Sequence, residues 1–105
     1  MATNRLEILR HMLEQDPKNS FARYGLAMEY AAAGTLEQAV AEYQTLIGND
    51  PGYVAAYFHG GQALEKLGKL EEARAIYVQG IAAASAKGDG HTRSEIQAAL
   101  DLLPV

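Results

Sequence analysis

The residues best suited to acid–base or metal chemistry are three histidines, His11, His59 and His91. They belong to three separate predicted elements, and no two of them have the spacing of metal ligands. The chain has no cysteine, which excludes thiolate metal sites and disulfides. The segment 88–90, Gly-Asp-Gly, lacks the series of carboxylates that a calcium-binding loop requires. We therefore predict no metal site and no cofactor.

The composition is that of one small acidic domain. The chain has 105 residues, of which 49% are hydrophobic, and a net charge of −4. Its nine Lys and Arg residues are dispersed and do not form the basic stripe of a nucleic-acid-binding protein. We therefore expect no nucleic-acid partner and no membrane partner. The N-terminus lacks the apolar run of a signal peptide, and no segment approaches the roughly 20 apolar residues of a membrane span, so we expect a cytoplasmic protein.

The sequence repeats itself with a period of 34 residues when 20–53 is laid over 54–87. The aligned pairs include Ala22 and Ala56, Tyr24 and Phe58, Gly34 and Gly68, Leu36 and Leu70, Ala39 and Ala73, Tyr43 and Tyr77, and Ile47 and Ile81. Asp16-Pro17 precedes Asp50-Pro51 by the same period. The chain therefore begins in the second half of a repeat.

Apolar periodicity, glycines and prolines predict about six helices and no sheet. The expected bounds are 3–15, 20–33, 35–48, 53–67, 70–84 and 92–103. Gly34 and Gly68 are suited to left-handed C-caps. Capping-box patterns place Thr35 with Gln38, and Thr92 with Glu95, at helix starts. Because the connections are short, consecutive helices should be antiparallel neighbours that stack to bury their apolar faces.

With this spacing the sequence resembles the tetratricopeptide repeat family, whose pattern is W-x2-L-G-x2-Y, then A-x3-F, then P. The first repeat has Arg23-x2-Leu26-Ala27-x2-Tyr30, Ala39-x3-Tyr43 and Pro51, and the second has Tyr57-x2-Gly60-Gly61-x2-Leu64, Ala73-x3-Tyr77 and Ser85. The resemblance implies an all-α, right-handed α-solenoid of about two and a half helix-turn-helix repeats with a C-terminal capping helix. We expect one domain over 1–105, composed of a half repeat at 3–19, repeats at 20–53 and 54–87, and the capping helix at 92–103.

Several residues depart from the family pattern. Arg23 stands where a large apolar residue is usual, and we expect its stem to cover the first helix while its charge reaches water. Three glycines of the second repeat should allow close backbone approach, with Tyr57 or Tyr77 filling the space. They are Gly60, Gly61 and Gly80. The apolar face of the last helix should cover the second repeat with Ile96, Ala99, Leu100 and Leu103.

The helix at 20–33 has a second apolar face. Leu26, Ala27 and Tyr30 lie on one side of it, and a surface helix needs only one such stripe. The resemblance implies that the opposite face lines a concave groove that binds a peptide or helix. The predicted groove residues are Phe21, Tyr24, Met28, Phe58 and Gln62, with His59, Glu65 and Lys66 at the edge. Tyr24 and Phe58 are equally compatible with core between the repeats.

The resulting hypothesis is a protein–protein interaction scaffold that binds a partner segment with apolar anchors in its concave groove. We do not expect an enzyme, because a short helical stack offers a shallow groove and not a closed pocket that excludes water. The alternative is a self-association module that uses the same apolar face to form a homodimer.

Overall fold

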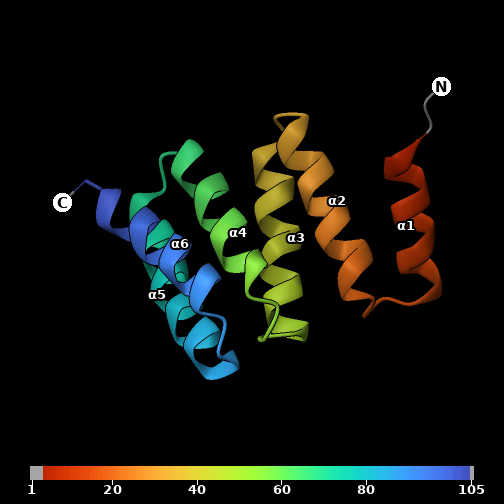
Figure 1. Cartoon of the computed structure of the whole chain (residues 1–105). Helices are drawn as coiled ribbons and strands as arrows, with labels where there is room; N and C mark the ends of the chain where they lie inside the picture. The colour runs from red at the N-terminus through yellow and green to blue at the C-terminus, as the bar shows by residue number, and fades with distance from the viewer. Residues whose placement is uncertain (1–3, 105) are drawn as a thin grey trace.

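The computed structural model describes residues 4–104, which form six α-helices and no strand. The helices are α1 (Arg5–Gln15), α2 (Ser20–Ala32), α3 (Leu36–Asn49), α4 (Ala55–Lys66), α5 (Leu70–Lys87) and α6 (Gly90–Leu102). Each helix packs on the next one along the chain, so that α1 and α6 lie at opposite ends of the row (Figure 1). The molecule is therefore an α-solenoid, as the repeat predicts. Residues 1–3 and 105 of the predicted domain, which include the expected start of the first helix, lie outside the described residues.

Most helix bounds differ from the sequence prediction by one or two residues, and the largest difference, three residues, lies at the end of α5. The fifth helix continues to Lys87 and not to residue 84, because Ala86 and Lys87 are good helix formers. It ends at Gly88, which has φ of 75°. The sixth helix begins at Gly90 and not at residue 92, with the Asp89 side chain accepting a hydrogen bond from the Thr92 amide at 3.0 Å. The capping box predicted for Thr92 and Glu95 is therefore wrong.

The predicted glycine C-caps are confirmed. Gly34 and Gly68 have φ of 84° and 77°, a left-handed conformation that glycine adopts without a Cβ clash. The amides of Gly34 and Thr35 donate to the carbonyls of Ala31 and Tyr30, at 3.1 and 3.0 Å, which closes the end of α2. The Thr35 hydroxyl also donates to the Tyr30 carbonyl, at 3.0 Å. Because that hydroxyl is used there, the capping box predicted for Thr35 and Gln38 is wrong as well.

Two hydrophobic clusters fill the stack. The first lies among α1, α2 and α3 and reaches Ala56 on α4, with Tyr43 at its centre. The second lies among α3, α4, α5 and α6 and surrounds Tyr77. Ala39 and Ala73 are completely buried, one in each cluster. The predicted cap is confirmed, because α6 covers the second cluster with Ile96, Ala99, Leu100 and Leu103.

Two of the three glycines predicted to make room for Tyr57 or Tyr77 do so, Gly61 and Gly80, whereas Gly60 faces Ile76 and Tyr43 instead. A Cβ atom on Gly61 would lie 2.1 Å from Cε1 of Tyr77, and one on Gly80 would lie 2.5 Å from Cβ of Tyr57. Real Cβ atoms do not approach other carbons so closely. These two positions therefore require glycine for the packing of α4 on α5.

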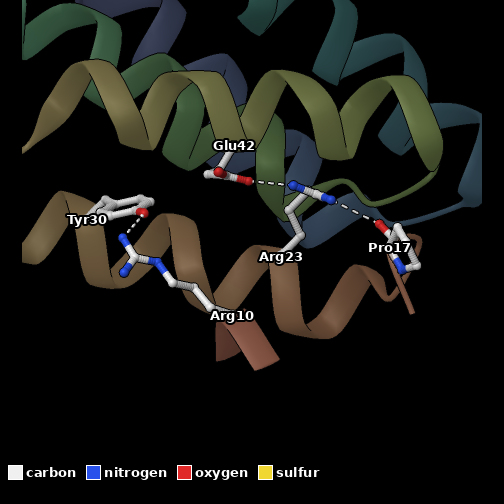
Figure 2. A network of polar contacts seen from close by, with 5 residues as sticks. All are labelled: Arg10, Pro17, Arg23, Tyr30 and Glu42. Carbon is white, nitrogen blue, oxygen red and sulfur yellow. Dashed lines mark hydrogen bonds and ion pairs between the residues drawn. The ribbon is translucent and has the colours of Figure 1, made fainter. Parts of the chain in front are cut away.

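The expectation that the Arg23 charge reaches water is wrong. Its side chain is only 16% exposed, and Nη1 lies 2.6 Å from Oε1 of Glu42 on α3. Nη2 donates to the Pro17 carbonyl at 2.9 Å, so the guanidinium joins α2, α3 and the α1–α2 turn (Figure 2). Beside it, Arg10 of α1 donates to the Tyr30 hydroxyl at 2.8 Å. A carboxylate on the facing helix thus replaces water as the partner of the charge.

Candidate functional site

Two adjoining pockets lie along helices α2, α4 and α6. The first, between α2 and α4, has a volume of about 240 Å³ and is lined by Met28, Ala31, Ala32, Leu36, Tyr43, His59, Gln62, Ala63 and Lys66. The second, between α4 and α6, has a volume of about 380 Å³ and is lined by Phe58, Gln62, Glu65, Glu95, Ala98, Ala99 and Leu102. Gln62 lines both pockets, so they form one continuous surface, which we call the groove.

An aromatic cluster packs next to the first pocket, and one of its members, Tyr43, lines the pocket itself. The Tyr24 ring lies 6.4 Å from the Tyr43 ring and 5.1 Å from the Tyr53 ring, measured between centroids. The Tyr43 hydroxyl donates to Sδ of Met28 at 2.9 Å. Burial raises the pKa of both Tyr24 and Tyr43, so these hydroxyls stay neutral and act as donors. The groove wall on α2 is therefore fixed by the core beneath it.

His59 lines the first pocket and is packed between two aromatic rings. Its ring lies 5.9 Å from the Tyr24 centroid and 5.2 Å from the Phe58 centroid, edge-on to both rings. Burial lowers the pKa of His59 because the apolar surroundings disfavour imidazolium, although the Glu95 charge raises it in part. The imidazole is thus a neutral side chain packed into the wall of the first pocket.

Carboxylates and an apolar floor characterise the second pocket. Glu65 accepts a hydrogen bond at Oε2 from the hydroxyl of Tyr77, which belongs to the buried core. Glu95 comes from α6, and its Oε2 lies 3.4 Å from Nε2 of the exposed His91. Leu102 is 85% exposed and stands at the rim. The pocket therefore combines fixed negative charge with uncovered apolar surface.

The structure brings together seven of the eight predicted groove residues. Met28, His59 and Lys66 line the first pocket and Phe58 and Glu65 the second, while Gln62 lines both and Tyr24 lies beneath. Phe21 lines neither pocket, and its ring is 66% exposed on α2. Tyr24 and Phe58 also pack against the hydrophobic clusters, and Phe58 in addition lines the second pocket.

The sequence prediction missed the contribution of α6. Glu95, Ala98 and Leu102 line the second pocket, whereas the sequence analysis treated this helix only as a cap. The available signal was Leu102, an apolar residue outside the face that covers the second cluster. A helix with one buried stripe and an additional exposed leucine has surface that its own fold does not need.

Other surface features are weaker candidates for a functional site. A pocket of about 380 Å³ between α3 and α5, lined in part by Gln44, Ile47 and Gln79, equals the second groove pocket in volume, but its described lining includes no aromatic ring. Within residues 4–104, no group of three or more histidine, aspartate or glutamate residues is placed to hold a metal ion. None of the six described helices combines the length and apolar character needed to cross a membrane.

The groove lies on a chain that is similar to known repeat proteins. The sequence profile of a family described as tetratricopeptide repeat matches residues 30–87. A TPR repeat-containing protein of Pseudomonas aeruginosa is 34% identical over 91 residues, which are 87% of each chain.

Solved structures give the same result at the level of the fold. The crystal structure of a tetratricopeptide repeat domain protein from Salinibacter ruber has a TM-score of 0.74 and 35% identity, and the match covers 78% of this chain and 91% of that one. The crystal structure of PcrH in complex with the chaperone binding region of PopD has a TM-score of 0.87 and 21% identity. That match covers 93% of this chain and 74% of PcrH and shows a shared fold.

Proposed function

Since the chain belongs to the tetratricopeptide repeat family, we propose that it is a protein-interaction scaffold whose groove binds an apolar segment of another protein. The observation that carries this proposal is the pair of adjoining pockets along α2, α4 and α6, with the exposed side chain of Leu102 in the lining of the second. Phe21 is exposed on α2, outside both linings. Contiguous apolar surface of this kind usually marks an interaction site.

The chemistry of the groove favours an extended or helical segment with apolar anchors. Aromatic rings and a methionine offer large and adaptable contact area. The two pockets are spaced along three helices, so that successive anchors of one segment can occupy both. PcrH, a protein of the same fold, forms a complex with the chaperone binding region of PopD. These features support a scaffold and not an enzyme.

The proposal is tested with two variants of α2, each of which is first checked for folding. The immobilised wild-type protein should retain a protein from the soluble extract of its source, identified by mass spectrometry. Phe21→Ser removes an exposed ring, and Met28→Glu places a charge in the first pocket. Both should lose the retained protein while keeping the circular-dichroism spectrum of the wild type.

The matched control is Val78→Ser. Val78 is 54% exposed on α5, a helix that lines neither groove pocket, so this variant removes a similar exposed apolar side chain elsewhere. It should retain the same protein as the wild type. Equal retention by all folded variants would contradict the proposal that the groove is the binding surface.

The alternative use of this surface is self-association. The 66% exposed Phe21 ring is the observation that favours it, because a second copy could cover the ring as well as a partner could. Light scattering of the wild type and of Phe21→Ser separates the two functions. A dimer that dissociates in Phe21→Ser would support self-association, and a monomeric wild type would exclude it.

A further inference from the structure

The charges of the groove are divided unevenly between its two pockets. Lys66 is the charged residue in the lining of the first pocket, beside the neutral His59. Glu65 and Glu95 are the charged residues in the lining of the second pocket, and its described lining includes no basic residue. A segment that lies along the groove thus meets negative charge at the α4–α6 end.

The two carboxylates are held close to the pocket by different means. The Tyr77 hydroxyl, which comes from the core, donates to Oε2 of Glu65 and fixes the direction of this carboxylate. Glu95 is paired at 3.4 Å with His91, whose side chain is 85% exposed. An ion pair so open to solvent contributes little, so a partner's cation can replace His91 at a small cost.

Covering this pocket with a neutral apolar segment would be unfavourable. Such a segment would remove water from Glu65 and Glu95 without bringing a positive charge to balance theirs. An arginine or lysine avoids this cost, because its aliphatic stem can pack on Phe58 and Leu102 while its charged head reaches the carboxylates. The apolar and acidic parts of the pocket therefore suit one and the same side chain.

We infer that the partner segment carries an arginine or lysine beside an apolar anchor, and that this basic side chain occupies the pocket between α4 and α6. The inference rests on the proposed function and adds the chemistry of the ligand to it. The segment recognised by this protein is then amphipathic and basic, in keeping with the net charge of −4 of the chain.

A phage-displayed library of random peptides of about 16 residues, roughly 24 Å long as helices, tests the inference on the full chain. The library is selected on the wild type, and the recovered peptides are then tested against Gln62→Trp. Gln62 is exposed and lines both pockets, so the indole obstructs the groove without entering the core. Peptides lost on Gln62→Trp are the groove-dependent ones.

Groove-dependent peptides should be enriched in arginine and lysine next to leucine, phenylalanine or methionine. A synthetic copy of one such peptide should bind Glu95→Gln about three- to five-fold more weakly than the wild type, and added salt should reduce this difference. The control Glu71→Gln removes the same charge from a 91% exposed side chain on α5 and should leave the affinity unchanged.

The remaining outcomes separate the two proposals. Groove-dependent peptides without basic enrichment, or with equal affinity for the wild type and Glu95→Gln, would overturn the inference and leave the proposed function standing. If no recovered peptide were lost on Gln62→Trp, the proposed function itself would be contradicted, and the inference with it.

Discussion

The ion pair between Arg23 and Glu42 is the most enclosed charge of the stack, with side chains only 16% and 22% exposed. The Nε atom of Arg23 is buried without a hydrogen-bond partner among the described residues. The guanidinium therefore depends on its contacts with Glu42 and with the Pro17 carbonyl. We expect Glu42→Leu to lower the free energy of unfolding by about 2–3 kcal/mol, because it leaves the largely enclosed Arg23 charge without a carboxylate and with only the Pro17 carbonyl as its partner.

The double variant Arg23→Met with Glu42→Leu should recover most of that loss, since two apolar side chains need no partner. Urea denaturation of the wild type, both single variants and the double variant gives the coupling energy. Additive losses would show that the two side chains do not act as a pair.

His59 gives the stability of the fold a pH dependence. Burial holds its pKa in the folded protein below the ordinary value of 6.5, so the unfolded chain binds the proton more readily. The resulting stabilisation is complete above pH 6.5 and is lost as the pH falls from there toward the pKa of the folded state. Phe58 and Tyr24 face the ring, and Glu95 opposes the shift only in part.

Urea denaturation at a series of pH values below about 6.5 measures this dependence. The unfolding free energy of the wild type should decrease more steeply with falling pH than that of His59→Gln, which cannot be protonated in this range. Parallel curves for the two proteins would show that the protonation of His59 is not linked to folding.

Two glycines in helices should respond oppositely to alanine. Gly61→Ala places a Cβ atom 2.1 Å from the Tyr77 ring, and we expect a net loss of about 1–2 kcal/mol despite the better helix propensity of alanine. Gly48→Ala meets no atom within 4 Å and should gain up to about 1 kcal/mol. Thermal denaturation compares the two variants, and a stabilised Gly61→Ala would mean that the ring moves away freely.

For single residues, the sequence predicts those features that depend only on neighbouring positions in the chain. Gly34 and Gly68 are recognisable as C-caps because a left-handed residue after a helix favours glycine wherever it occurs. The pairing of Arg23 is different, because its partner Glu42 belongs to another helix and 19 residues separate the two along the chain. No spacing within α2 identifies that partner.

The capping helix α6 combines a structural face with a groove face. Ile96 is completely buried and packs against α5 at Gly80. A Cβ atom added to Gly80 would lie 3.0 Å from Cδ1 of Ile96. We expect Ile96→Ala to lower the free energy of unfolding by about 2–4 kcal/mol, because the cavity would form at the end of the second cluster.

Leu102→Ala is the matched control on the same helix. Leu102 is 85% exposed, so its truncation should change stability by no more than about 0.5 kcal/mol. Thermal and urea denaturation measure both variants. Equal losses for the two would mean that the helix does not pack through Ile96.

The elements themselves follow closely from the 34-residue period, because each helix end is defined by a glycine, a proline or a turn residue nearby. The bounds of α5 and α6 were less accurate, since the helix formers before Gly88 extend α5 to that glycine. The groove role of α6 could not be obtained from a period, because α6 departs from the repeat. The division into repeats at 20–53 and 54–87 stays a prediction.

The six described helices form a row, and the stability of each helix depends on how many neighbouring helices it packs against. α3 packs on both α2 and α4, whereas α1 packs mainly on α2 at the end of the row. Because the stability of a solenoid is a sum over nearest-neighbour interfaces, the end helix should open first. Amide hydrogen exchange should therefore be faster in α1 than in α3, and equal protection of the two helices would indicate fully cooperative opening.

The tyrosine cluster beneath the groove also gives the protein an optical property. The chain has six tyrosines and no tryptophan, so its near-ultraviolet emission comes from tyrosine. The centroid of the Tyr24 ring lies 5.1 Å from that of Tyr53 and 6.4 Å from that of Tyr43, which lines the first pocket. A tryptophan carried by a bound ligand would accept excitation energy from these rings, and occupation of the groove would then produce a fluorescence signal without any label.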